Sequence, residues 1–245
     1  MTKSLIFIVF SLFLGLPMLH AQGKAQAFSG SFLMSFESTG TQSKEPSILW
    51  TIRQDTKHPD YMMEIKDEMN VKGVIKRAMF SPADSTWIMT LAYNMNKQAV
   101  KVHSSSMYRD SVQDDKKITF KKTTEQKRIQ GILCRKVIFE SEKYYSEVWV
   151  SDSFKVELAK LYGLMSHCGM AGEFIRKGDW YKTGKVKGMI LEVYCREKKT
   201  GASYTIRISS IHTGSVDDKI FSLSGFKISE IPEGQSCTSN RYTEE

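Results

Sequence analysis

Apolar and polar side chains alternate through most of this chain, and this period of two constrains its fold more than any other feature. Phe28, Phe32, Met34 and Phe36 fall on one side of the first such stretch, while serine and glutamate side chains fall on the other. This alternation is typical of a strand with one buried face. It predicts strands at 28–37, 48–52, 61–66, 71–80, 86–93, 99–103, 118–122, 133–140, 146–150, 189–195 and 204–208.

Short, turn-rich pieces such as His58-Pro59-Asp60 connect the predicted strands. They are too short for the crossovers that parallel strands need, so we expect an antiparallel meander. A sheet of about ten strands must curl or be covered to bury its apolar side. The expected fold is therefore mainly β (α+β): a strongly curved antiparallel half-barrel sheet over one or two helices, in a single domain at residues 22–245.

One segment changes the period. Phe154, Leu158, Leu161 and Met165 are spaced i, i+4, i+7 and i+11, which predicts a helix over 153–165. Asp152 or Ser153 is placed to cap its N-terminus. The glycine-rich stretch that follows, 163–188, is predicted to be a loop.

Residues 1–21 have the pattern of a cleavable signal peptide. Lys3 gives the positive start, Leu5–Leu16 the apolar centre, and Ala21 the small residue before the cleavage site. No later apolar stretch reaches the ~20 residues of a membrane-spanning helix. Cys134 is the first cysteine, so none lies at the cleavage point to carry a lipid anchor. We expect a soluble exported protein, in the periplasm or, as the alternative, outside the cell.

The formal net charge of +8 raises the question of whether the protein binds a negatively charged partner. An exported protein does not meet nucleic acid, which removes that class of partner. The densest basic stretch, Lys116–Arg128, also carries Asp114, Asp115 and Glu125 in or beside it. A solvated strand pair with mixed charge is the first interpretation, and peripheral contact with an anionic membrane is the second. The sequence specifies no oligomeric state.

Four cysteines permit two disulfides in an oxidising compartment, with three ways to pair them. Buried thiols are the alternative. No Cys-x-x-Cys spacing is present, which argues against a zinc ribbon or a thioredoxin-like site. The candidates are Cys134, Cys168, Cys195 and Cys237.

Motifs for enzymatic chemistry are missing from the sequence. It has no Gly-x-Ser-x-Gly elbow, no His-Glu-x-x-His and no phosphate-binding glycine loop, so we expect no catalysis, metal or cofactor. The enzymatic alternative is a secreted thiol-dependent hydrolase with Cys168 as nucleophile and His212 or His103 as its base.

Methionine and aromatic residues are frequent on the N-terminal strands. Methionine is flexible and polarizable, which suits a surface that accepts a variable apolar guest, although an ordinary filled core uses the same residues. The candidate lining residues are Phe32, Met34, Trp50, Met63, Trp87, Met89, Phe154, Leu158 and Leu161.

Three short motifs resemble a known family. Ile129-x-Gly131-x-x-Cys134-x-Lys136 and Trp149-Val150-Ser151-Asp152 resemble its central motifs, and Val216–Leu223 with Gly225-Phe226 resembles its closing motif. In the last of these a proline is missing and Phe226 replaces tyrosine. The family is the DUF4412 group of exported envelope proteins of uncharacterised function.

That family is similar in turn to the periplasmic lipoprotein carriers of the LolA and LppX type. The resemblance implies an open, curved half-barrel closed over helices, which holds acyl chains and does no chemistry. The expected function is a non-catalytic periplasmic protein that binds a lipid, a lipoprotein acyl chain or another apolar ligand between sheet and helix. An interaction or structural envelope protein with a filled core is the alternative.

Overall fold

The computed structural model describes residues 25–39, 47–54, 59–66, 75–81, 86–93, 96–103, 118–156, 162, 180–181 and 185–231. Several predictions therefore lie outside the described residues: those on the signal peptide at 1–21, Leu158, Leu161, Cys168 and Cys237. In the part that is described, no helix is both long enough and apolar enough to cross a membrane.

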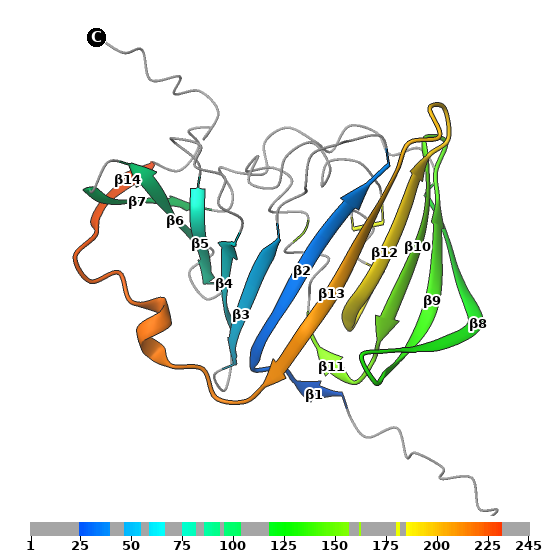
Figure 1. Cartoon of the computed structure of the whole chain (residues 1–245), viewed down its shortest axis with the longest axis horizontal. Helices are drawn as coiled ribbons and strands as arrows, with labels where there is room; N and C mark the ends of the chain where they lie inside the picture. The colour runs from blue at the N-terminus through cyan, green and yellow to red at the C-terminus, as the bar shows by residue number, and fades with distance from the viewer. Residues whose placement is uncertain are drawn as a thin grey trace, which may run out of the picture.

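One sheet of twelve strands makes up most of the described chain (Figure 1). All neighbouring strands in it run antiparallel except β14 and β7, which run parallel. The expected mainly β, antiparallel sheet is confirmed. From edge to edge the strands are β14 (Lys227–Ile231), β7 (Asn96–His103), β6 (Thr86–Tyr93), β5 (Ile75–Ser81), β4 (Pro59–Ile65), β3 (Ile48–Gln54), β2 (Gly30–Ser38), β13 (Ser203–Thr213), β12 (Met189–Glu197), β10 (Tyr144–Ser151), β9 (Ile132–Glu140) and β8 (Thr119–Ile129).

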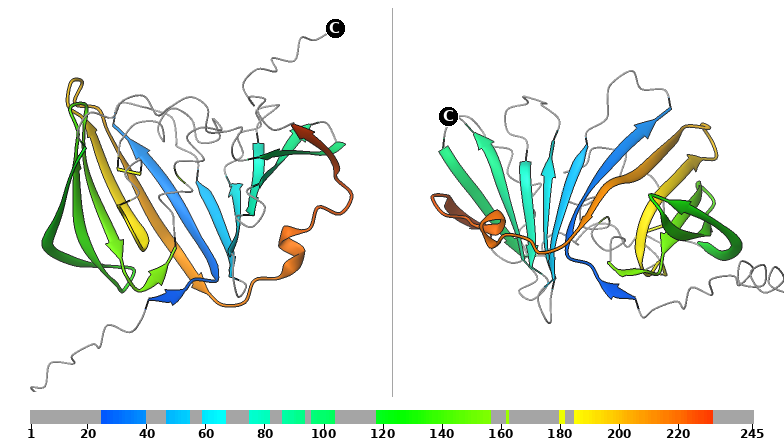
Figure 2. Two further views of the ribbon diagram at one scale, coloured as in Figure 1. Left: turned by 180° about the vertical axis from the view of Figure 1, so that it is seen from behind. Right: turned by 60° about the horizontal axis from the view of Figure 1, so that its bottom comes forward.

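Two runs of sequential strands build this sheet, and the ladder between β2 and β13 joins them at its centre. That ladder extends from the pair Tyr204 and Ser38 to the pair Thr213 and Gly30, with an irregularity between Ser209 and His212. Figure 2 shows the sheet bent into an open trough whose edges, β14 and β8, lie far apart. The sheet is an open, bent one, and each of the eleven predicted strands overlaps one of its strands.

Apolar side chains from both runs share one face, which we call the inner face. The register places them in cross-strand rows, so that Met34 lies opposite Ile208 and Ile48, and Trp50 lies opposite Met63. Rows of this kind explain the alternation in the sequence, because every second side chain must enter the same core. The same parity continues to the far strands, where Val137 of β9 lies opposite Val148 of β10.

Two methionines face the other way. Met62 and Met79 lie opposite each other on β4 and β5, on the outer face, and both are buried. The methionines of the N-terminal strands therefore do not all line one surface, and only alternate positions such as Met63 contribute to the inner face.

The predicted helix does not begin where the apolar spacing placed it. Phe154–Lys155 forms the short strand β11, which pairs in parallel with β1 (Gln26–Ala27). The ring of Phe154 packs edge-to-face on that of Phe28, with centroids 5.3 Å apart. The first residue of the predicted helix thus belongs to a strand, residues 157–161 lie outside the described part of the chain, and Tyr162 is helical.

Asp152 does not cap a helix either. Its carboxylate accepts two hydrogen bonds from the guanidinium of Arg135, at 2.7 and 2.8 Å. These bonds lower the pKa of Asp152, because they favour the ionised carboxylate. The backbone N–H of Ser153 donates to the hydroxyl of Ser151 at 3.2 Å, which closes a turn.

After β13 the chain crosses the outer face in residues 214–226, which we call the outer strap, and then enters β14. The strap contains the one-turn 3-10 helix η1 (Asp218–Phe221), whose first turn is capped by the side chain of Asp217. Arg53 of β3 holds it in place. This guanidinium donates to Asp218 at 2.8 Å and lies 4.7 Å from the ring centroid of Phe221.

Cys134 and Cys195 are both buried as thiols, so a disulfide between them is not formed. The register explains this. Cys195 on β12 lies opposite Ser146 of β10, which in turn lies opposite Phe139 of β9. Cys134 is five residues from Phe139 along β9, and a disulfide needs Cα atoms within about 7 Å.

Candidate ligand-binding site

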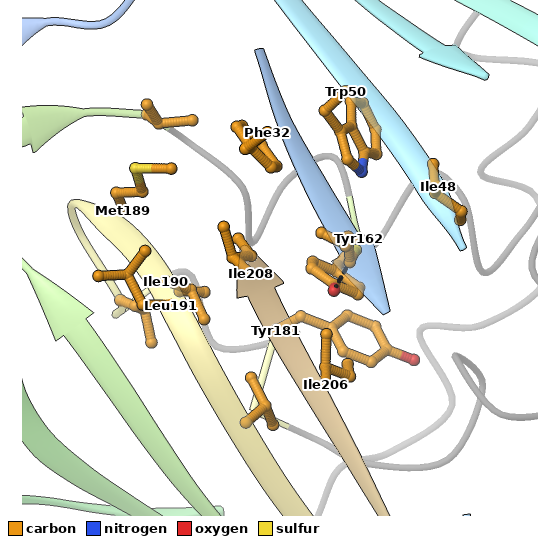
Figure 3. Packing of buried hydrophobic residues seen from close by; sticks show 14 of the residues in the cluster. Phe32, Ile48, Trp50, Tyr162, Tyr181, Met189, Ile190, Leu191, Ile206 and Ile208 are labelled. Carbon is orange, nitrogen blue, oxygen red and sulfur yellow. Dashed lines mark hydrogen bonds between the residues drawn. The ribbon is translucent and has the colours of Figure 1, made fainter. Parts of the chain in front are cut away.

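Six of the predicted lining residues come together on the inner face of β2, β3, β4 and β6. Five of them are fully buried and Met89 is 6% exposed. They belong to one continuous apolar cluster that extends across the sheet, part of which is drawn in Figure 3. These residues are Phe32, Met34, Trp50, Met63, Trp87 and Met89.

The other three predicted residues do not extend this group in the way expected. Phe154 is half-buried and packs against the same cluster, but it does so from β11. Leu158 and Leu161 lie outside the described residues.

Two tryptophan rings on the inner face each pack against a phenylalanine ring of a neighbouring strand. The ring of Phe32 stacks on that of Trp50 from the neighbouring strand, with centroids 6.5 Å apart and planes 25° apart. The ring of Phe80 stacks on that of Trp87 in the same way, at 4.7 Å and 23°. Cross-strand stacking of this kind fixes the plane of each indole.

The indole N–H groups of Trp50 and Trp87 are buried without a hydrogen-bond partner. Within the described residues, these two nitrogens are the only buried side-chain polar atoms in that state. A buried donor without an acceptor costs about 1–3 kcal/mol, and native proteins hold few of them. The inner face therefore carries two polar groups whose partners are not part of the described chain.

Three aromatic residues that the sequence analysis did not select cover part of the inner face. Tyr162, Trp180 and Tyr181 are buried in the same cluster, and the rings of Tyr162 and Trp180 meet edge-to-face at 4.8 Å. The Tyr162 hydroxyl donates to the sulfur of Met34 at 2.7 Å, drawn as a dashed line in Figure 3. The Trp180 indole donates to the hydroxyl of Tyr204 at 3.3 Å.

These residues were missed because they fall in or beside the segment that its glycines marked as a loop. The pair Trp180-Tyr181 was the available signal, since two large aromatic residues in a loop are normally buried. Burial raises the pKa of Tyr162 and of Tyr204 well above the ordinary range, so both hydroxyls stay protonated.

No charged side chain is buried in the described part of the inner face. The buried polar residues of the whole described chain are neutral hydroxyls, namely Thr51, Thr86, Thr90, Ser146 and Ser151. A search of the same residues finds no group of three or more metal-ligating side chains. Such a surface can bind apolar groups and neutral hydrogen-bond acceptors.

The nucleophile of the thiol-enzyme alternative is not among the described residues, and its two candidate bases lie on different parts of the sheet. Cys168 lies outside the described residues, and five strands separate His103 on β7 from His212 on β13. Burial raises the pKa of Cys134 to about 11, which keeps this thiol protonated at neutral pH and unreactive.

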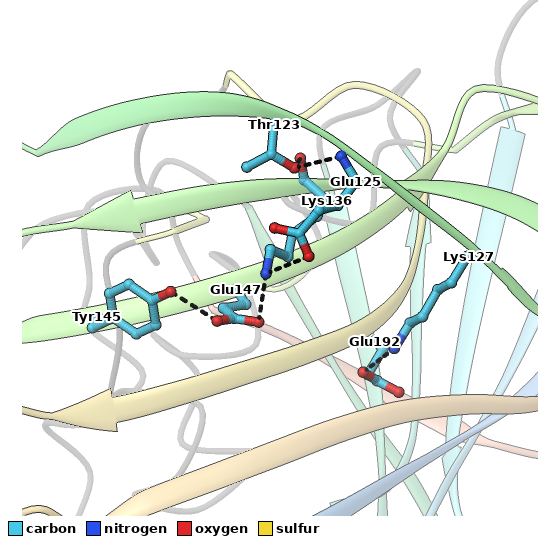
Figure 4. A network of polar contacts seen from close by, with 7 residues as sticks. All are labelled: Thr123, Glu125, Lys127, Lys136, Tyr145, Glu147 and Glu192. Carbon is cyan, nitrogen blue, oxygen red and sulfur yellow. Dashed lines mark hydrogen bonds and ion pairs between the residues drawn. The ribbon is translucent and has the colours of Figure 1, made fainter.

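The outer face of β8, β9, β10 and β12 carries a network of charges (Figure 4). Lys136 lies between Glu125 and Glu147, at 2.9 and 3.4 Å, and Lys127 pairs with Glu192 at 2.7 Å. The amine of Lys127 also lies 4.3 Å from the ring centroid of Trp149. Basic residues of β8 and β9 are thus matched by carboxylates, as expected for a solvated surface of mixed charge.

A cleft of about 270 Å³ lies between the outer strap and the sheet. It is lined by polar residues such as Ser31, His212 and Asp217 and by apolar ones such as Leu49 and Ile220. Its volume is below the ~300–1,000 Å³ of most small-molecule sites, and none of the predicted lining residues of the inner face borders it.

A family model describes most of this chain. The model of the domain of unknown function DUF4412 matches residues 28–224. The chain belongs to this family. The DUF4412 match begins just before β2 and ends within the outer strap, so it includes the whole inner face described above. The resemblance stated from the three short motifs is confirmed. No curated protein matches the sequence.

Comparison with solved structures finds several distant likenesses. PNGF-II has a TM-score of 0.48 at 15% identity, covering 84% of this chain and 31% of that one, so this DUF4412 chain spans about a third of PNGF-II. A putative outer membrane lipoprotein-sorting protein domain from Vibrio parahaemolyticus has a TM-score of 0.34 at 10% identity, covering 81% and 91%. A DUF1329 family protein from Desulfovibrio piger has a TM-score of 0.35 at 10% identity, covering 82% and 91%.

Proposed function

We propose that this protein binds a lipid, an acyl chain or another apolar ligand on the inner face of its sheet and does no chemistry on it. The observation that supports this most is the continuity of the apolar face, which extends from Val102 on β7 to Phe139 on β9. Aromatic rings and methionines dominate it between β2 and β6. Residues of these types accept flexible apolar guests through many weak contacts.

Export is part of the same proposal. The pattern of residues 1–21 supports export, and the periplasm is the compartment proposed, with the extracellular space as the alternative. A protein that carries an acyl ligand through an aqueous compartment must shield the ligand from water, and an inner face without buried charge is suited to that task. Peripheral contact with an anionic membrane would follow from the net charge of +8.

One observation favours a second candidate, an interaction or structural envelope protein whose core is filled. Tyr162, Trp180 and Tyr181 already pack on the inner face, and two hydrogen bonds anchor them to Met34 and Tyr204. If they fill all of the space beside the sheet, no ligand enters. The two candidates differ in whether an acyl chain reaches the inner face.

Fluorescence quenching by bromine tests directly whether an acyl chain reaches the inner face, because a brominated acyl chain quenches the fluorescence of tryptophans that it touches. The chain has four tryptophans, of which Trp50, Trp87 and Trp180 face the core and Trp149 lies on the outer face beside Lys127. We expect a lysophospholipid with a brominated acyl chain to quench a large part of the emission at saturable, low concentration. The unbrominated lipid is the matched control for effects other than contact.

The variant Trp149→Phe locates the lipid. It removes the outer-face emitter, so the fraction of emission that stays unquenched should fall if the chain lies on the inner face. Quenching that disappears in Trp149→Phe would place the lipid on the outer face and refute the proposal. Absence of any saturable quenching would favour the filled-core candidate.

A further inference from the structure

The two unpartnered indole donors of the inner face carry an inference about the ligand itself. Trp50 and Trp87 are fully buried, and no acceptor among the described residues lies within hydrogen-bond range of either N–H group. Phenylalanine would place a smaller aromatic ring at both positions without burying a donor. Tryptophan at these positions therefore needs a reason beyond packing.

The stacking geometry limits where each donor points. Phe80 stacks on the Trp87 ring, and Phe32 lies nearly parallel to the Trp50 ring with a larger offset. An indole N–H lies in the plane of its ring, so neither donor can be directed at the phenyl ring that stacks on it. Each N–H is presented at the edge of a fixed ring, among apolar neighbours.

Tyrosine hydroxyls pack on this face, but none that the structure describes accepts a hydrogen bond from Trp50 or Trp87. Tyr162 donates to the sulfur of Met34, and Tyr204 accepts from Trp180. Trp180 thus shows how an indole on this face is normally satisfied, and it differs in this respect from Trp50 and Trp87.

We infer that the ligand of the inner face is a fatty acyl ester, whose uncharged carbonyl oxygens accept hydrogen bonds from Trp50 and Trp87. The inference rests on the proposed function and narrows it to a chemical class. An apolar chain alone would leave both donors without an acceptor. A carbonyl oxygen placed beside an apolar chain supplies both kinds of contact in one molecule.

We expect an uncharged acceptor because no buried side chain that the structure describes on this face would neutralise a charge. All buried polar side chains that the structure describes are neutral, so a free fatty carboxylate would enter the core without a cation. Burying an unpaired carboxylate is far less favourable than burying an ester carbonyl. The inner face should therefore select the ester over the free acid with the same chain.

A matched pair of lipids tests this without any substitution. Dipalmitoyl-phosphatidylcholine and its di-O-hexadecyl ether analogue differ only in the two carbonyls, and native mass spectrometry of an equimolar mixture measures their competition for the intact protein. We expect the ester to bind roughly 2- to 10-fold more tightly than the ether, the range expected for a neutral hydrogen bond. Palmitate should compete more weakly than the ester.

The variants Trp50→Phe and Trp87→Phe test whether the preference for the ester over the ether depends on these two indole donors. Each keeps a stacked ring and removes one donor, so each should reduce the ester-to-ether ratio. Trp149→Phe is the matched control, because it removes an indole from the outer face and should leave the ratio unchanged. If a variant does not fold, the wild-type comparison of ester with ether still decides the inference.

The outcomes separate this inference from the proposed function. If neither ester nor ether binds, the proposed function is wrong and the inference falls with it. If both bind equally, or if palmitate binds best, the apolar ligand stands and the acyl-ester inference is refuted. A diacylglyceryl-cysteinyl peptide distinguishes the source: stronger displacement by it indicates a lipoprotein anchor, and weaker displacement indicates a glycerolipid, both of which carry the ester.

Discussion

Gly30 lies directly against the backbone carbonyl of His212, so closely that a β-carbon at position 30 would overlap the carbonyl oxygen. Gly30 also has φ of +144°, a conformation that other residues rarely adopt. The contact lies where β2 and β13 meet, beside the irregularity in their ladder. This glycine allows the two halves of the sheet to join.

The substitution Gly30→Ala should therefore destabilise the protein strongly. Both the overlap and the backbone conformation oppose a side chain, and we expect the free energy of unfolding to fall by about 2 kcal/mol or more. Gly131→Ala is the control, because Gly131 has φ of +76° but a β-carbon there would meet no atom within 4 Å. Its loss should be near 1 kcal/mol, roughly the cost of the left-handed conformation alone. Equal losses in urea denaturation would show that the approach to His212 does not matter.

Arg53 should control the attachment of the outer strap. The substitution Arg53→Gln removes the ion pair with Asp218 and the cation–π contact with Phe221. The substitution also removes the ion pair of Arg53 with Asp60 on β4, and because both carboxylates are at least partly exposed we expect the global free energy of unfolding to fall by about 1 kcal/mol. Exchange of the amide protons of Ile220 and Ser222, which bond within η1, should become faster in NMR measurements.

Arg207→Gln is the matched control for this prediction. Arg207 also pairs with an exposed carboxylate, that of Glu37, but it lies on β13 and does not touch the strap. Its loss should leave exchange in η1 unchanged. Similar acceleration in both variants would mean that the strap responds to charge in general.

Cys134 should make the protein less stable in alkali. Burial raises the pKa of this thiol from 9.0 to about 11, so the folded state retains a proton that the unfolded state releases. The contribution is complete below pH 9 and is lost as the pH rises through about 11, at up to about 1.4 kcal/mol per pH unit. The variant Cys134→Ala should show a flatter decline of the unfolding free energy between about pH 9 and 10.

Between about pH 9 and 10, the effect of Cys134 on the unfolding free energy can be measured without a contribution from Tyr145. Tyr145 is buried in part and donates to Glu147, which raises its pKa from 10.0 to about 12, so its own loss begins only above pH 10. Parallel pH curves for the wild type and Cys134→Ala below the ordinary pKa of tyrosine would contradict the assignment. Ellman's reagent should also react slowly with Cys134 until the protein unfolds.

Tyr204 should anchor Trp180 to the sheet. The substitution Tyr204→Phe leaves the Trp180 indole buried without its acceptor, which should lower the free energy of unfolding by about 1–3 kcal/mol. The double variant Tyr204→Phe with Trp180→Phe should recover part of that loss, because it removes the orphaned donor as well. Additive losses in this double-mutant cycle would show that the bond contributes nothing.

The strands could be predicted from the sequence because every second residue of a strand points to the inner face and is apolar there. The range predicted for β6, 86–93, coincides with the observed strand, and Trp87 and Met89 face the core as their parity requires. β14 could not be found in this way. Its residues are almost all exposed, and its place is set by backbone pairing with β7, which leaves no pattern in the side chains.

The candidate site was predicted in part for the same reason. The alternation of apolar residues predicted Phe32, Trp50 and Trp87. It carries no information about hydrogen bonding, so only the structure shows that two of the indole donors have no acceptor. Phe154 shows the opposite error. Its spacing to Leu158 fits a helix, whereas its contact with Phe28 comes from β11. The spacing therefore placed the start of the helix too early, while residues 157–161 lie outside the described part of the chain and Tyr162 is helical.

The ladder between β2 and β13 also decides when this chain can finish folding. Glu37 and Arg207, which it brings together, are separated by 170 residues, whereas the hairpins on either side close over a few residues each. Local hairpins form early and distant pairings late, so a chain that is still being made holds two partial sheets. Their inner edges, β2 and β10, lack partners until β12 and β13 arrive. During that interval β2 and β10 are templates for pairing with other chains, and chaperone protection is most needed there.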